Sequence, residues 1–169
     1  MLMIPEVLSN CAGFIDGVSF AGEMPSLTLP KVVLKTEAYR GGGMAGEVEI
    51  PTGVEKLEAG FTTNGVRREA LKFFGLSDRT ACSAVFRGSF KGLKGKVTPV
   101  IVTMRGGIKE VDMGDWKPGD KAETKHNMAL TYYKLEVAGR VVYEIDMLGM
   151  VLVVDGVDQL ADERSALGL

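Results

Sequence analysis

The glycines near residue 40 have the spacing of a dinucleotide-binding loop. Gly41, Gly43 and Gly46 match the pattern G-x-G-x-x-G within YRGGGMAGE. Such a loop needs a helix behind it, whose N-terminus binds the pyrophosphate. The segment that follows, EVEIPTG, instead alternates polar and apolar residues and then reaches Pro51 and Gly53. No Gly-Lys-Ser/Thr follows either, which excludes a Walker loop. We therefore predict that these glycines do not bind a nucleotide.

Two acidic residues could form a carboxylate pair. Glu144 and Asp146 lie two positions apart in an alternating segment, so on a strand their side chains share one face. Paired carboxylates can perform acid–base chemistry. Two solvated acids on an exposed strand are the commoner case, and no partner base is evident in the sequence. Both interpretations stay open here.

The other reactive side chains are isolated. His126 is the single histidine, and its neighbours Lys125 and Asn127 offer no metal-ligand spacing, so we interpret it as a surface residue. Cys11 and Cys82 form no CxxC pair. They are expected to stay reduced, although one disulfide between them is an alternative. We predict no catalytic residue, no cofactor, no metal site and no enzymatic activity.

A basic and aromatic cluster, VFRGSFKGLKGK (85–96), is similar to an RNA-binding strand motif. The motif requires an aromatic residue after the glycine, whereas Ser89 stands there, and the later aromatic positions are missing. A charged edge strand that hides Val85 is the prediction for this segment.

Length and composition indicate one globular domain. The chain has 169 residues, of which 46% are hydrophobic and 25% charged, with a formal net charge of -2. This balance excludes a nucleic-acid binder that works by bulk positive charge. The start, MLMIPEVLSN, has no basic residue, and the most apolar stretch, MLGMVLVV (147–154), is too short for a membrane helix. A soluble cytoplasmic product without stable membrane association is expected.

The dominant hydrophobic period is two, which indicates strands. We expect strands at 17–22, 26–37, 47–50, 55–63, 85–90 and 96–106. Pro30 interrupts the second of these, which predicts an edge or a bulge there. The clearest hairpin spans 128–148, with a turn at Ala138 and Gly139. One face of its first strand is expected to carry Ala129, Thr131, Tyr133, Leu135 and Val137.

Two helices are expected beside these strands. The first covers 65–75, with Thr63 or Asn64 as its cap and Gly75 as its end. The second lies near the C-terminus, after a turn at Asp155 and Gly156, with Asp158 as its cap. The sum is a mainly antiparallel β domain with more sheet edge than one chain can cover. Because exposed edges need partners, the pattern favours an assembly subunit whose Gly-rich stretch is a mobile arm.

The whole chain resembles the major tail tube proteins of contractile-tailed bacteriophages, an FII-type family, and is very similar to the tube subunit of R-type pyocins. The resemblance is carried, in order, by FIDGVSFAGEMPSLTLPKV, KTEAYRGGGM, FTTNGVRREALKFFGL, FRGSFKG, KEVDMGDWKPGDKAE, TYYKLEVAGRVVYEID and DGVDQLADERSALGL. The succession is specific, while no single motif is. It does not separate a phage origin from a pyocin origin.

The resemblance implies one tail-tube domain over residues 1–169, folded as an antiparallel β-barrel or sandwich with a mid-chain helix and a short C-terminal helix. In that family six copies form a ring around a lumen, with four strands from each copy lining it, and rings stack into a tube. A long loop, here about 37–54, reaches the adjacent ring. The predicted inter-ring residues are Tyr39, Arg40, Gly41, Gly42, Gly43, Met44, Gly46 and Glu47.

The resemblance also implies partners and a location. They are the sheath protein, the baseplate hub or tube initiator, the tail terminator and the tape-measure protein. A phage tube conducts DNA without sequence-specific binding, and a pyocin tube depolarises the target membrane. Assembly is expected in the host bacterial cytoplasm, and the product in the virion tail or a released pyocin particle. Glu144 and Asp146 could face the lumen, where acids would let a polyanion slide.

Composition alone permits a second function. A small β-sandwich could bind a carbohydrate or peptide, with Trp116 of the GDWKPGD loop as a stacking platform. A tryptophan that merely stabilises its loop is the alternative interpretation.

Overall fold

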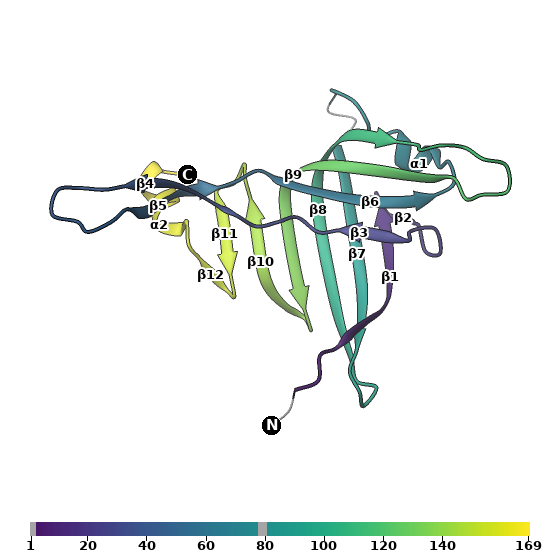
Figure 1. Cartoon of the computed structure of the whole chain (residues 1–169), viewed down its shortest axis with the longest axis horizontal. Coiled ribbons are helices and arrows are strands. Elements are labelled where there is room, and N and C mark those ends of the chain that lie inside the picture. The colour runs from purple at the N-terminus through teal and green to yellow at the C-terminus, as the bar shows by residue number, and fades with distance from the viewer. Residues whose placement is uncertain (1–2, 78–80) are drawn as a thin grey trace.

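The structure is a computed structural model that describes residues 3–77 and 81–169. Met1 and Leu2 of the N-terminal stretch considered above lie outside this range. The described residues form an almost entirely antiparallel β fold with two short helices (Figure 1). The elements are β1 (Val7–Ile15), β2 (Val18–Ser19), β3 (Ser26–Thr28), β4 (Leu34–Tyr39), β5 (Val48–Val54), β6 (Leu57–Asn64), α1 (Arg68–Leu71), β7 (Ala81–Lys91), β8 (Val97–Asp112), β9 (Glu123–Val137), β10 (Arg140–Asp146), β11 (Val151–Val154), β12 (Val157–Asp158) and α2 (Ala161–Leu167).

Local sequence sets the hairpin turns. Ala138 and Gly139 join β9 to β10 with φ values of 51° and 80°, and Asp155 and Gly156 join β11 to β12 with 48° and 85°. Successive positive φ values match the right-handed twist of the flanking strands, which is why a small or acidic residue followed by glycine is favoured there. Both turns are predicted from the sequence, and both are confirmed.

One long sheet runs in the order β12-β11-β10-β9-β8-β7-β1-β2. Strand β9 changes its neighbour halfway along. Its first part, residues 123–130, pairs with β6, which also pairs with β3, while residues 132–137 pair with β10. In Figure 1, β3 and β6 cross over the long strands β7 to β9. The sheet therefore folds over itself into two layers.

The fold-over point depends on a glycine. The register between β8 and β9 shifts between Arg105 and Gly106, opposite Thr131. A Cβ at Gly106 would lie 2.0 Å from the carbonyl oxygen of Ala129, so only glycine permits this approach of the two backbones. The shift also reverses the alternation of β9. Ala129 and Thr131 are exposed whereas Tyr133 is buried, so the prediction that they share one face is wrong.

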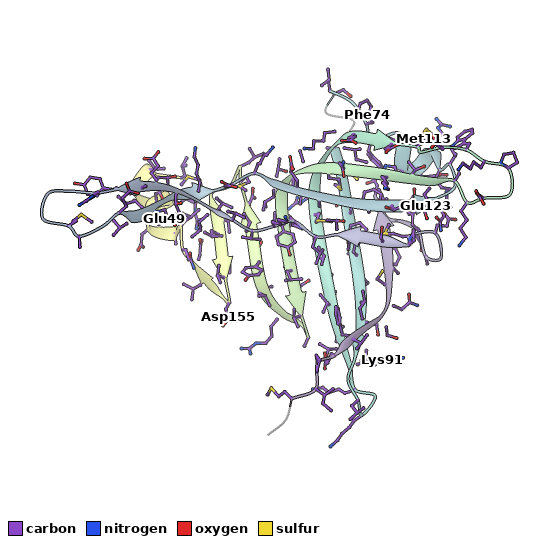
Figure 2. The ribbon with its side chains drawn as sticks, viewed as in Figure 1. Glu49, Phe74, Lys91, Met113, Glu123 and Asp155 are labelled. Atoms are coloured by element: carbon purple, nitrogen blue, oxygen red, sulfur yellow. The ribbon has the colours of Figure 1, made fainter. Side chains whose placement is uncertain are left out.

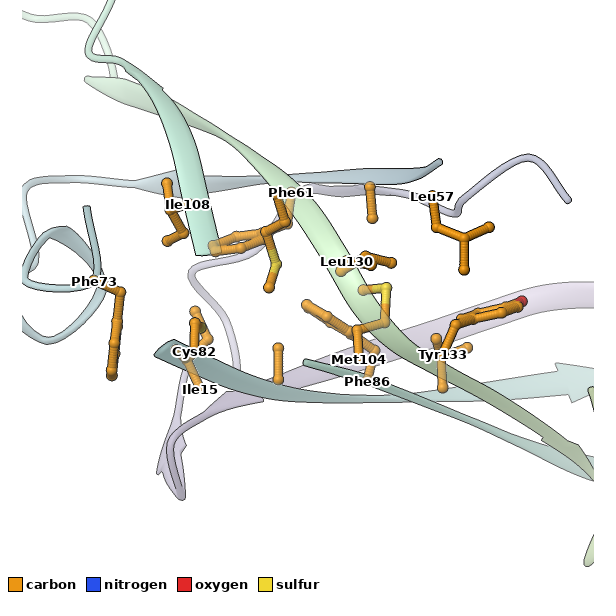
Figure 3. Close-up of a cluster of buried hydrophobic side chains, with 14 of the residues drawn as sticks. Ile15, Leu57, Phe61, Phe73, Cys82, Phe86, Met104, Ile108, Leu130 and Tyr133 are labelled. Atoms are coloured by element: carbon orange, nitrogen blue, oxygen red, sulfur yellow. The ribbon is translucent and has the colours of Figure 1, made fainter. Parts of the chain in front are cut away.

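The core lies between the two layers (Figure 3). Phe61 from β6 meets Phe86 from β7 with ring centroids 5.9 Å apart. Met104 of β8 and Tyr133 of β9 are 0% and 3% exposed. Burial of one such large side chain stabilises the folded state by about 1.5–3 kcal/mol. The alternating apolar positions of the long strands are thus used to join the layers.

The segment 85–90 is not a sheet edge. Strand β7 pairs with β1 on one side and with β8 on the other. Phe86 and Ala84 are buried, while Val85 is only half-buried and points to the opposite face. The prediction that this segment hides Val85 at an edge is therefore wrong, because β1 covers the edge.

The mid-chain helix is much shorter than predicted. Asn64 remains in the ladder between β6 and β9, so it cannot serve as the cap. Helix α1 begins only at Arg68 and has no side-chain cap. Arg67 donates to both carboxylate oxygens of Glu23, at 2.6 and 2.7 Å, and lies over the Phe20 ring. These contacts fix the chain where the first helical turn was expected.

The C-terminal helix α2 is also attached differently from the prediction. Asp158 ends β12, and the residue before the helix is Leu160, which makes no side-chain cap bond. Asp158 still controls the junction, because it accepts the Leu160 N–H at 3.1 Å and pairs with Arg164 at 2.8 Å. The Arg164 guanidinium lowers the pKa of the Asp158 carboxyl below its usual value.

Candidate assembly surfaces

The long sheet has a second face, opposite the core, on which no described side chain is fully buried. The register places one row of side chains from successive strands on it. We call this surface the open face; its central residues are Arg87, Ile101, Thr103, Arg105, Tyr132, Lys134, Glu136, Glu144 and Asp146. An antiparallel sheet can pack one face on the core while its other face contacts water or another molecule.

The open face is polar and mixed in charge. The Arg105 guanidinium lies 4.1 Å from the Tyr132 ring centroid, and the Tyr132 hydroxyl donates to Glu144 at 3.1 Å. Lys134 lies 3.7 Å from Glu136. Burial, and then the Glu144 carboxylate, raise the pKa of Tyr132. Positive and negative groups therefore neutralise one another along the face.

Glu144 and Asp146 share this face, as the sequence predicts. Each is held by different groups. Glu144 accepts from Tyr132, whereas Asp146 accepts the N–H groups of Leu148 and Gly149 at 3.1 and 2.9 Å. Asp146 thus stabilises the turn between β10 and β11. The structure uses both acids as hydrogen-bond acceptors in the sheet and its turn.

The second surface is a hairpin that projects from the body (Figure 1). Among the described residues, strands β4 and β5 pair only with each other. We call residues 34–54 the arm. The expected strand at 26–37 is therefore split: β3 pairs with β6, Pro30 falls in the unpaired segment that follows, and β4 begins at Leu34. The predicted mobile stretch at 37–54 is instead a β-hairpin for most of its length.

The tip of the arm holds the residues of the suspected nucleotide loop. The Met44 N–H donates to the Gly41 carbonyl at 3.3 Å, and Gly43 has a φ of 83°. The segment after the glycines is strand β5, as expected, so no helix N-terminus faces them. Tyr39, Arg40, Gly42, Gly46 and Glu47 complete this tip. Its glycines make a tight turn at the end of the arm.

The two faces of the arm differ in chemistry. Tyr39 pairs with Val48, and Glu37 with Ile50, so these four side chains share one face. Tyr39, Val48 and Ile50 are 55%, 47% and 46% exposed. Solvent-exposed apolar side chains of this size on an isolated hairpin are typical of an interaction surface.

His126 lies in the core and not on the surface, so the sequence interpretation is wrong. It is 1% exposed, stacks on Phe61 with centroids 4.6 Å apart, and its Nε2 lies 3.2 Å from the Thr63 hydroxyl. Burial lowers its pKa to about 4, so the ring is neutral near pH 7. The missed signal is its period: Thr124, Met128 and Leu130 fall on the same buried face.

The ligand-binding alternative finds little support in the loop that carries Trp116. This side chain is 66% exposed in the connection between β8 and β9. A cavity of about 250 Å³ at the base of that loop is lined by polar groups such as Asp112 and Lys125, without Trp116. In residues 3–77 and 81–169, no group of three or more histidine, cysteine, aspartate or glutamate residues could hold a metal ion.

Two further sequence expectations concern the cysteines and the membrane. Cys11 and Cys82 are free thiols, and burial raises the pKa of Cys82 to about 11. Within the part of the chain that the structure describes, no helix is long and apolar enough to span a membrane.

Comparison with known proteins identifies the family. The model of phage tail tube protein FII matches residues 5–168. The chain belongs to this tail tube family. It is 38% identical to the major tail tube protein of Serratia phage KSP20 and 33% identical to the tail tube protein of Escherichia phage P2. Each match covers 99% of this chain, and 99% and 100% of those relatives respectively.

Solved structures of contractile injection systems share the tail tube fold. A sheath/tube terminator structure of an extracellular contractile injection system matches with a TM-score of 0.59 at 10% identity, covering 80% of this chain and 99% of that one. The sheath–tube complex matches with 0.58 at 10% identity over 78% and 91%. A baseplate structure of the anti-feeding prophage matches with 0.53 at 12% identity over 81% and 99%. The predicted fold class, mainly antiparallel β with two helices, is confirmed.

Proposed function

We propose that this protein is the structural subunit of the inner tube of a contractile tail. The observation that carries the proposal is the family match over residues 5–168, joined to a structure with uncovered sheet edges. In this proposal six copies form a ring, and rings stack into a hollow tube that sheath contraction drives through the target envelope. The protein acts by assembly and not by catalysis.

Ring formation uses the two ends of the long sheet. Strand β1 pairs with β2 only at Phe14 and Ile15, so most of its outer edge is free of partners among the described residues. At the other end, β12 covers only Val153 and Val154 of β11. Pairing of one copy's β1 edge with the next copy's β11 edge would continue the sheet around a closed ring, which removes both edges.

The open face then lines the lumen. Its position opposite the core makes it the face that remains accessible after the sheet closes, with β7 to β10 as the four lining strands. The acids Glu144 and Asp146 lie beside Arg105 and Lys134. The lumen of this proposal is therefore balanced in charge, which gives DNA neither a strong attraction nor a uniform repulsion.

The partners follow from the same proposal. The similar solved structures are of a sheath–tube complex, a sheath/tube terminator and a baseplate, which supports contacts with a sheath, a terminator and a baseplate hub. A tape-measure protein in the lumen during assembly, DNA passage in a phage and membrane depolarisation by a pyocin-like particle complete the proposal. Assembly takes place in the host cytoplasm, and the finished tube resides in the virion tail.

Electron microscopy of the purified protein tests this function. We expect hexameric rings or tubes in negative stain, and a sedimentation coefficient that rises with protein concentration. A strict monomer at all concentrations, together with a melting temperature that increases with an oligosaccharide or peptide, would contradict the proposal and favour the ligand-binding module.

A further inference from the structure

One end of the molecule carries an apolar and basic surface that overlaps the proposed ring edge only at Val7 and Leu8 of β1. It consists of the N-terminal residues 3–8 and the β7–β8 turn at 91–97, and we call it the basic tip. The two parts are fastened together, because the Thr98 hydroxyl donates to Glu6 at 2.9 Å. Leu8 also lies against Gly88, where an added Cβ would be 3.3 Å from its Cδ1.

The basic tip exposes large apolar side chains between lysines. Met3, Val7 and Leu93 are 89%, 68% and 79% exposed. Lys91, Lys94 and Lys96 surround them, and none of these lysines forms an ion pair within the described residues. Three lysines and Glu6 give the tip a net charge of +2. A surface of this kind is typical of a protein contact with an acidic, apolar partner.

The arm has the complementary chemistry. Its exposed apolar face carries Tyr39, Val48 and Ile50. Glu37 lies on this face, Glu47 directly precedes β5 at the tip of the arm, and Glu49 lies on the opposite face beside Ala38. All three acids are exposed and form no ion pair with any described residue. Lys35 and Arg40 offset two of these acids, so the arm, residues 34–54, has a net charge of -1. The arm and the basic tip are therefore complementary, because both expose apolar side chains and their net charges are opposite in sign.

The two surfaces cannot meet within one chain. Figure 2 shows Glu49 on the paired strands of the arm and Lys91 at the separate lower end of β7. The arm projects along the long axis of the molecule, while the basic tip lies at the ends of the long strands (Figure 1). Any contact between them therefore joins two copies of the chain.

We infer that the arm of one copy docks on the basic tip of a copy in the adjacent ring. This inference rests on the proposed function and specifies the receptor for the arm. Burial of Tyr39, Val48 and Ile50 against the apolar residues of the tip supplies the attraction. The opposite charges fix the pairing, because two arms or two tips would bring like charges together. A ring therefore stacks head-to-tail and in one orientation only.

Charge reversal with rescue tests this pairing. The tip variant K91E/K94E/K96E and the arm variant E37K/E47K/E49K each change only exposed side chains, so both should fold and form rings. We expect each to raise the protein concentration needed for half-maximal stacking by at least about tenfold, because several exposed ion pairs become repulsive. Combining all six substitutions should restore stacking to within about threefold of the parent protein.

A matched control reverses the charge of three exposed lysines outside the basic tip. K117E/K121E/K125E has the same change of net charge and lies at the opposite end of the long strands, so it should stack like the parent. The inference would be overturned if the two triple variants stack as readily as the parent protein. It would also be overturned if the combined six substitutions do not restore stacking, or if the control variant stacks as poorly as the triple variants. If the parent protein itself forms no rings, the proposed function fails instead.

Discussion

The two-layered body and the arm are both antiparallel β structure, yet they differ in what their apolar side chains contact. Phe61 and Met104 of the body are 3% and 0% exposed, whereas Tyr39 and Ile50 of the arm are 55% and 46% exposed. A lone two-stranded hairpin is marginally stable in water. The same alternating pattern therefore stabilises one chain in the body and, in the proposed tube, connects different chains through the arm.

Truncation of one apolar residue in each region should give the largest contrast. We expect F61A to lower the free energy of unfolding by about 3–5 kcal/mol, because it removes a buried ring between the layers. The matched arm variant I50A should lower it by less than about 0.5 kcal/mol. Urea unfolding of the dissociated subunits measures both values.

The comparison is broken if I50A costs as much as F61A. In that case the arm would be packed within its own chain, and its apolar face would not be free for another copy.

Acid should lower the stability of the body more than that of the arm, because the buried His126 belongs to the body. Its folded pKa is about 4 against an ordinary value of 6.5. The unfolded chain therefore binds the proton first as the pH falls. Stability contributed by the neutral ring is fully present above pH 6.5 and is lost between about pH 6.5 and 4, by about 3 kcal/mol.

The variant H126F isolates this effect, since it keeps an aromatic ring against Phe61 and leaves the carboxylates unchanged. Urea unfolding at pH 7 and pH 4 should show a smaller loss for H126F than for the parent. Equal losses in the two proteins would mean that His126 does not control the acid sensitivity of the body.

A smaller effect should come from the fold-over point of the sheet. G106A places a Cβ against the Ala129 carbonyl and should destabilise the body by about 1–3 kcal/mol. The neighbouring G107A is the control, because a Cβ at Gly107 meets no atom within 4 Å. Thermal melting of both variants measures the difference. A G106A protein as stable as G107A would show that the two layers need no close approach there.

The sequence predicts the body better than its irregularities. Alternation and the turns at Ala138 and Asp155 predict the strands, because buried faces and positive φ angles restrict residue types. Alternation cannot reveal the shift near Thr131, since a residue added on one strand changes the face of every later side chain. His126 is missed for a related reason: its buried neighbours become visible as one face only when β9 is counted from Thr124.

The candidate surfaces are predicted less completely. The arm is found from its glycines and from the family resemblance, but its pairing is not, because Pro51 and Gly53 disfavour a regular strand and a register shift accommodates them. Glu144 and Asp146 are placed on one face correctly. Their basic neighbours on the open face, Arg105 and Lys134, come from other strands, so only the sheet register brings these residues together.

Deletion of residues 40–47 tests the central claim most directly, since it removes the tip of the arm and leaves the core intact. Negative-stain microscopy and sedimentation of the purified variant should show folded rings that do not stack, with an unfolding midpoint equal to that of the parent subunit. A deletion variant that polymerises into tubes as readily as the parent protein would contradict the inter-ring role of the arm.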